Sequence, residues 1–136
     1  MKFLALLLII LLPIFTKAQT NWTIQTTGTI QNLNSIQFID GNTGFAVGNA
    51  AVVLKTTNGG INWTSISTAR NYNFLSVSVP SSNVVYIGTD TNKVLKTIDG
   101  GGTWSLIQNV SLSSAFNISS MSFYTSDYGF LCGNLN

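Results

Sequence analysis

The chain has 136 residues, a formal net charge of +2, and neither histidine nor glutamate. Two of its six basic residues, Lys2 and Lys17, lie near the N-terminus, and the other four are matched by four aspartates. Residues 19–136 therefore hold no basic patch of the kind that nucleic acids or anionic lipids require, which excludes nucleic-acid binding.

The first eighteen residues have the pattern of a secretory signal peptide. Phe3 to Phe15 are apolar, with Pro13 among them, and Thr16-Lys17-Ala18 places small residues where a signal peptidase reads. We predict a signal peptide over 1–18, cleaved before Gln19. The alternative, a transmembrane helix, needs about 20 apolar residues without a proline. We therefore expect a secreted, periplasmic or cell-surface protein with no transmembrane segment after signal removal.

An internal repeat dominates the rest of the chain. Trp22, Trp63 and Trp104 are separated by two equal intervals. TTNGGINW (56–63) and TIDGGGTW (97–104) end in two of these tryptophans, and each follows a Val-Leu-Lys. Periods of about 40 to 50 residues with tryptophan and glycine landmarks are typical of the blades of a β-propeller.

Each period contains four short apolar segments separated by turn residues, which predicts four-stranded antiparallel blades. The fold class is therefore all-β, a partial β-propeller with about 2.5 blades. Ser120–Phe123 and Gly129–Gly133 repeat the start of the first blade after an insertion around 111–115. The expected units in chain order are an outer strand over 21–27, a blade over 33–67, a blade over 74–108 and a half blade over 118–134.

The number of blades is too small for a closed ring. Propellers close with about 4 to 8 blades, and the third blade stops at Asn136 before its own tryptophan. We interpret 19–136 as an incomplete propeller, that is, an N-terminal fragment. Its expected partners include the remaining blades of the full-length chain. The alternative is assembly with copies of itself. We favour the fragment, because a closed ring removes exposed sheet edges whereas an open one invites aggregation.

The repeated turn has a physical explanation that needs no ligand. An aspartate or asparagine accepts hydrogen bonds from amides two residues on, in an Asx turn. The glycines supply positive φ, the threonine hydroxyl bonds another amide, and the tryptophan is a peg between sheets whose N–H can reach a carbonyl. A catalytic or metal-binding Asp99 is the alternative interpretation, which the turn chemistry disfavours.

The turn resembles the Asp-box, also called the BNR repeat, with the pattern Ser/Thr-x-Asp-x-Gly-x-Thr-Trp. In families with this motif the turns lie on the outer rim, which implies a structural role. The second copy matches fully, and the first has asparagine at two positions. The structural residues expected from the motif are Thr56, Asn58, Gly60 and Trp63 in the first copy, and Thr97, Asp99, Gly101, Thr103 and Trp104 in the second.

Two further segments resemble one Asp-box family more than the others. DGNTGFAVGN (40–49) and SDYGFLCGN (126–134) are most similar to the photosystem II assembly and stability-factor type found in exported bacterial proteins. The resemblance implies the fold and a non-enzymatic role in binding a protein or a glycan through face loops. Plant and cyanobacterial members carry an arginine-rich face, whereas this chain has only Arg70, so photosystem assembly is not carried over.

Catalysis by the visible residues is disfavoured. Sialidases with this fold use three arginines and a Tyr–Glu pair, and other glycosidases use two carboxylates across the substrate. Asp40 and Asp127 lie in segments that turn formation explains, so no catalytic residue, cofactor or metal site is predicted here. The alternative function is the N-terminal part of a secreted glycoside hydrolase whose carboxylates lie in missing blades.

Ligand contacts are expected on loops that lead from one blade to the next. The candidates are Arg70 and Tyr72, between the first two blades, and Phe116, before the third. The alternative is an ordinary solvated loop. Cys132, the single cysteine, cannot form an internal disulfide and is expected to be a small buried core residue.

Overall fold

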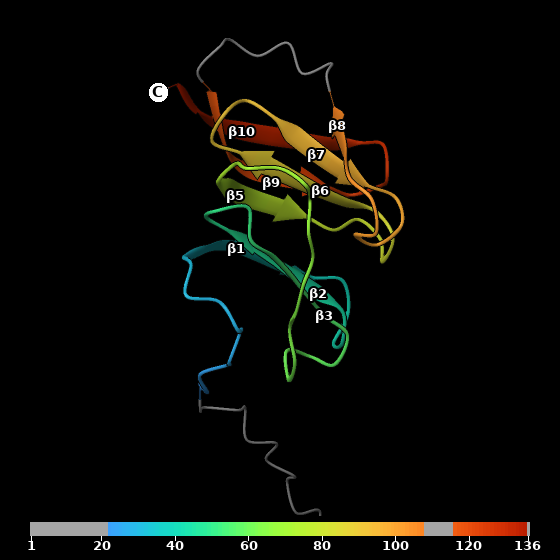
Figure 1. Cartoon of the computed structure of the whole chain (residues 1–136). Coiled ribbons are helices and arrows are strands. Elements are labelled where there is room, and N and C mark those ends of the chain that lie inside the picture. Colours follow the sequence, from blue (N-terminus) through green and yellow to red (C-terminus); the bar gives the residue numbers. More distant parts are fainter. Residues whose placement is uncertain (1–21, 108–115, 136) are drawn as a thin grey trace, which may run out of the picture.

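The computed structural model describes residues 22–107 and 116–135, all of whose regular elements are β-strands (Figure 1). In this part of the chain no helix long and apolar enough to cross a bilayer occurs. The predicted signal peptide and the insertion around 111–115 lie outside the described residues. The strands are β1 (Leu33–Phe38), β2 (Gly44–Gly48), β3 (Val53–Thr56), β4 (Thr64–Ser65), β5 (Phe74–Ser78), β6 (Val85–Thr89), β7 (Val94–Thr97), β8 (Ser105–Ile107), β9 (Phe116–Phe123) and β10 (Gly129–Leu135).

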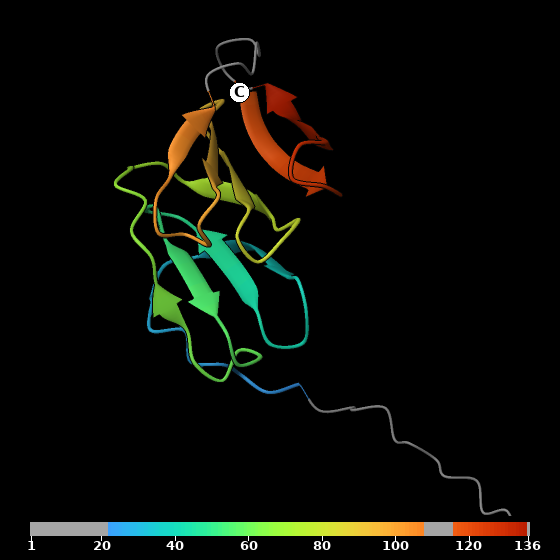
Figure 2. The same cartoon turned by 90° about the vertical axis from the view of Figure 1, so that its right-hand side faces the viewer.

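The strands form three antiparallel sheets that follow one another along the chain (Figure 2). The first blade has the order β1-β2-β3-β4, the second β5-β6-β7-β8, and the third sheet contains β9 and β10. The inner strand β5 contacts both β1 and β9. The chain thus forms a partial propeller of successive sheets whose inner strands are neighbours.

The strand register repeats with the sequence period. Ile36 pairs with Ala46 in the first blade. Val77 and Ile87, which lie one repeat period later in the sequence, form the equivalent pair in the second blade. The strands of the two blades cover residues 33–65 and 74–107, whereas the ranges predicted for the blades were 33–67 and 74–108. The repeat in sequence is therefore a repeat in hydrogen bonding.

Two apolar clusters hold the sheets together. The first lies between the two blades and joins Phe45, Val47 and Val53 to the apolar side chains of β5, β6 and β7. The second lies between the second blade and the third sheet, where the Tyr86 and Phe123 rings stack with centroids 3.8 Å apart. Burial of these faces supplies the main force that keeps the sheets in contact.

Polar side chains of the inner strands join neighbouring sheets. Val79 N donates to Gln37 Oε1 at 2.9 Å, and Phe123 N donates to Ser78 Oγ at 2.9 Å, at equivalent places in successive sheets. Ser76 Oγ donates to the Ile118 carbonyl at 2.8 Å. Ser76 and Ser78 are buried, and these bonds satisfy polar groups that would otherwise be costly there.

A close approach of two backbones explains the second glycine of Gly-Phe-x-x-Gly. A Cβ on Gly48 would overlap the backbone carbonyl of Asn32, and a Cβ on Gly133 would overlap that of Asn117. No side chain fits at either place without displacing the inner strand. The two glycines therefore mark the point where the second strand passes the start of the inner strand.

The outer strand predicted over 21–27 is absent from the described residues. Residues 22–32 contain no strand, and the Trp22 side chain is fully exposed. A strand requires a partner edge, and no described strand pairs with residues 22–27. The strand stays a prediction, because it relies on a neighbouring sheet that the described residues do not provide.

Cys132 is also placed differently from the expectation. It is equivalent to the fully buried Val47 but is exposed. Val47 belongs to the cluster between the two blades, whereas in the described residues no sheet follows β10. A buried environment at this position of the repeat depends on the next sheet and not on the residue itself.

Candidate functional site

The second Asp-box turn is a dense hydrogen-bond network centred on two side chains. Thr97 Oγ1 accepts from the amides of Asp99 (3.3 Å) and Gly101 (3.0 Å) and donates to Asp99 Oδ1 at 2.6 Å. Asp99 Oδ1 also accepts from Thr103 N at 2.9 Å, and Oδ2 accepts from Thr103 Oγ1 at 2.7 Å. Both carboxylate oxygens are therefore engaged within the turn.

The first Asp-box turn repeats these connections despite its asparagines, except for the side-chain bond from Thr103 to Asp99. Thr56 Oγ1 accepts from Gly60 N at 2.9 Å and donates to Asn58 Oδ1 at 3.0 Å, and Asn62 N donates to the same oxygen at 2.9 Å. The Asx bond was expected two residues on, but the side chain bonds the amide four residues on. The Thr56 hydroxyl accepts from the amide two residues on, so the expected geometry is wrong in this detail.

These bonds change the acid–base behaviour of the aspartate. The Thr97 hydroxyl, then the amide and hydroxyl of Thr103, hold the pKa of Asp99 well below its usual value. Hydrogen bonds to the charged form of a carboxylate favour that form. These bonds engage both carboxylate oxygens within the turn and stabilise it.

The low pKa of Asp99 predicts a loss of stability in acid. Because the folded pKa lies below the unfolded value of about 3.9, this stabilisation is present above that value and is lost as pH falls towards the folded pKa. We expect the denaturant concentration at the unfolding midpoint to fall less steeply in Asp99→Asn than in the parent protein between about pH 4 and pH 2. Denaturant unfolding across this range is the measurement.

The converse variant provides the control for this prediction. Asn58→Asp places a titratable group in the first turn, where Thr56 and the Asn62 amide offer the same bonds, and should steepen the decline. Asp40, whose pKa is lowered by the amides of Thr43 and Asn42, remains in all variants. An unchanged acid profile in Asp99→Asn would contradict the assignment.

The tryptophans of the two turns are half-buried. Trp104 packs against the cluster between the blades, and Trp63 meets Phe38 edge-on with ring centroids 6.1 Å apart. Their Nε1 atoms are buried and have no hydrogen-bond partner in the described structure. The expected bond from each indole N–H to a carbonyl is therefore wrong, and the contribution of both rings comes from apolar packing.

A hollow lies at the end of the sheets where β4 leads to β5, which we term the connection end. Its volume is about 420 Å³. Arg70 is exposed at this hollow, and Thr68 is 5% exposed with an Oγ1 that has no partner among the described residues. The connection-end hollow is lined by Ala50, Ala51, Val52 and the segment Ser65, Ile66, Ser67, Thr68, Ala69 and Arg70.

The structure places the other two candidates in packing roles. The Tyr72 ring is half-buried against the cluster between the blades, and its carbonyl accepts from Ala51 N at 2.9 Å. Phe116 begins β9 and packs against the second cluster. Among Arg70, Tyr72 and Phe116, only Arg70 presents its side chain to the connection-end hollow.

Three alanines around the hollow have backbone angles that favour glycine. Ala50, Ala51 and Ala69 have φ of 53°, 59° and 53°. Such angles cost about 1 kcal/mol or more per residue and persist only where the surroundings enforce them, often at binding sites. Asn73 Oδ1 accepts from Ala50 N at 3.1 Å and helps to hold this turn. Alanine carries no turn signal, so the sequence did not reveal these positions.

The four aspartates of the chain are all engaged in local contacts. Asp40 accepts from two turn amides, Asp90 accepts from Asn73 Nδ2 at 2.8 Å, and Asp127 lies 3.7 Å from Lys96 Nζ. Asp99 is held in its turn. Among the described residues, no three histidine, cysteine or acidic side chains gather at one place.

The successive four-stranded sheets and the two hydrogen-bonded turns define a β-propeller of BNR repeats. The chain belongs to the family described as photosynthesis system II assembly factor YCF48, whose model matches residues 14–108. This match covers more than half of the sequence. It agrees with the resemblance inferred from the tryptophan-ended repeat and the Gly-Phe-x-x-Gly segments.

Solved structures of this family share the fold. A structure described as YCF48 bound to D1 peptide is 27% identical, with a TM-score of 0.68 over 79% of this chain and 36% of that chain. YCF48 from Cyanidioschyzon merolae is 21% identical, with a TM-score of 0.72 over 84% of this chain and 38% of its own. The chain thus spans less than two-fifths of either structure. No curated protein matches it.

Proposed function

We propose that this chain belongs to an exported, non-enzymatic propeller that binds a protein partner at the connection end of its sheets. The observation that carries the proposal is the connection-end hollow, where an exposed guanidinium lies beside a buried hydroxyl that lacks a partner among the described residues. The Arg70 guanidinium is exposed there and can bond a carbonyl or carboxylate of a ligand.

Two further observations support a peptide as the ligand. The backbone of Ala50, Ala51 and Ala69 is held in a costly conformation beside Arg70, as expected of a preformed site. A relative in the same family has been solved with D1 peptide bound. The D1 peptide itself is not transferred to this chain, since Arg70 is its only arginine.

Export is proposed from the sequence. The apolar run Phe3–Phe15 and the small residues Thr16 and Ala18 support a signal peptide. The single cysteine fits a fold held by sheet packing and by the turn networks. A binding protein with this architecture would act outside the cytoplasm, at the cell surface or in the periplasm.

The role of Arg70 can be tested with selected peptides. Peptides would be chosen from a displayed random library on the full protein, and their binding mapped by amide chemical shifts. We expect shifts at residues 50–52 and 66–70, and a loss of affinity of about tenfold in Arg70→Gln, equal to about 1.4 kcal/mol. Removal of one charge-assisted bond has an effect of this size.

Lys93→Gln is the matched control, because it removes one exposed positive charge from the turn between β6 and β7 in the second blade. Its affinity for the same peptides should equal that of the parent protein. Equal affinities in the parent and Arg70→Gln, or shifts confined to other faces, would refute the proposed site. Selection of glycans and not peptides by the full protein would refute the proposed class of partner.

A further inference from the structure

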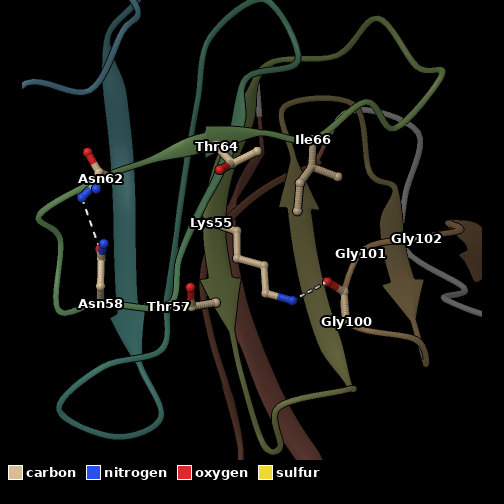
Figure 3. A pocket seen from close by; sticks show the side chains of 9 residues that line it. All are labelled: Lys55, Thr57, Asn58, Asn62, Thr64, Ile66, Gly100, Gly101 and Gly102. Carbon is tan, nitrogen blue, oxygen red and sulfur yellow. Dashed lines mark hydrogen bonds between the residues drawn. The ribbon is translucent and has the colours of Figure 1, made fainter.

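A second hollow lies between the blades, beside the two Asp-box turns (Figure 3). Its volume is about 430 Å³. One wall comes from the β3–β4 hairpin of the first blade and the other from the glycine turn of the second. This rim groove is lined by Lys55, Thr57, Asn58, Asn62, Thr64, Ile66, Gly100, Gly101 and Gly102.

The Lys55 ammonium is the charged group of the rim groove. Its stem is half-buried, Nζ lies 5.3 Å from the centroid of the Phe45 ring, and it donates to the Gly100 carbonyl at 2.9 Å. An ammonium has three N–H donors, and this bond uses one. Within residues 22–107 and 116–135 no carboxylate lies at ion-pair distance from Lys55.

The internal repeat shows what Lys55 lacks. Lys96, one period later in the sequence, lies over the Tyr86 ring at 5.1 Å, donates to the Ser126 carbonyl at 3.2 Å, and pairs with Asp127 at 3.7 Å. Each lysine lies over an aromatic ring and donates to a backbone carbonyl of the next sheet, although the two carbonyls belong to different hairpins. Of the two, only the lysine of the second blade has a counter-ion within the described residues.

The missing counter-ion follows from one substitution in the repeat. The hairpins of residues 79–85 and 123–129 have equal length, and Asn83 occupies the place of Asp127. A Cβ on Gly100 would lie 3.1 Å from Lys55 Nζ and 3.9 Å from Asn83 Oδ1, so both groups border this glycine. Asn83 therefore puts an amide at the place in the repeat where the carboxylate of Asp127 pairs with Lys96.

We propose that the rim groove binds a carboxylate side chain of an acidic peptide, with Lys55 as its counter-ion. Thr57, Asn62 and Thr64 come from the same hairpin as Lys55 and line the groove beside it, where their polar side chains can bond the peptide backbone. The glycine turn allows a close approach to the backbone of the second blade. Of the residues that line the groove, only Ile66 also lines the connection-end hollow.

The test uses amide chemical shifts of Gly100, Gly101 and Gly102 in the full protein. The probes are the blocked peptide Ac-Gly-Ser-Glu-Ser-Gly-NH₂, the same peptide with glutamine, and sodium acetate. We expect saturable shifts with the glutamate peptide, no saturation with the glutamine peptide, and weaker binding of acetate. Acetate binding as tightly as the glutamate peptide would overturn the assignment to a peptide.

Three variants test the role of the lysine. Lys55→Met retains an unbranched stem over Phe45 and should weaken the glutamate peptide at least fivefold, whereas Lys93→Met should not change its binding. Asn83→Asp supplies an internal counter-ion like Asp127 and should weaken the peptide similarly in a folded protein. Retained affinity in both Lys55→Met and Asn83→Asp, or no saturable shift in the parent, would overturn the proposal.

Discussion

Replacing Trp104 by alanine is expected to lower the free energy of unfolding by about 3 kcal/mol, through the cavity left between the two blades. The ring is half-buried against the cluster that joins Phe45 and Val53 to the second blade. Its Nε1 makes no hydrogen bond in the described structure, so the whole effect comes from lost packing. Denaturant unfolding of the full protein measures it.

A neighbouring apolar residue provides the control. Ile98 lies in the same hairpin and is 69% exposed, so Ile98→Ala should cost less than about 0.5 kcal/mol. The contrast between the two variants separates interblade packing from a general response of the hairpin. A loss below about 1 kcal/mol in Trp104→Ala would show that the ring is not a peg between sheets.

The second large effect is expected from Thr97→Val, which preserves shape but removes the hydroxyl. Thr97 is 1% exposed, and its Oγ1 is the acceptor for the buried amide of Gly101. Valine would leave that amide without a partner, at a cost of about 2 kcal/mol. The unfolding free energy should fall by this amount, while the spectroscopic signature of β-sheet remains.

The first blade provides a replicate and a control. Thr56→Val removes the equivalent acceptor of Gly60 N and should produce a similar loss. Thr57→Val changes an exposed neighbour and should be nearly neutral. If Thr97→Val and Thr57→Val were equally stable, the hydroxyl would not be the centre of the turn.

The sheets could be predicted from the sequence because the repeated residues and the strand pairing have the same period. Val-Leu-Lys-Thr opens the hairpin in both blades, and the pairs Ile36–Ala46 and Val77–Ile87 recur one period apart. A strand whose partner is encoded a few residues away is specified by local turn chemistry. The fold class and the two blades follow from this locality.

The sequence could not predict features that depend on the neighbouring sheet. Cys132 repeats the position of Val47 but has no covering sheet among the described residues, and Trp22 has no strand to join there. Ser76 and Ser78 alternate with apolar residues like solvent-facing positions, yet both are buried in bonds to β9. Periodicity alone does not show what packs against a face.

The candidate site was only partly accessible from sequence. Arg70 was identified as the single arginine on a loop between blades, and the structure places it at the connection-end hollow. Thr68 and the left-handed alanines carried no pattern that marks a site. Lys55 became distinctive only when its surroundings were compared with those of Lys96.

The most direct test of the central claim, that each repeat unit is a four-stranded blade wedged against the next, is a crystal structure of the full protein. We expect the Trp104 ring between the sheets of residues 33–65 and 74–107, with Thr97 Oγ1 bonded to Gly101 N. An indole of Trp104 in solvent, or the two sheets apart, would contradict the account.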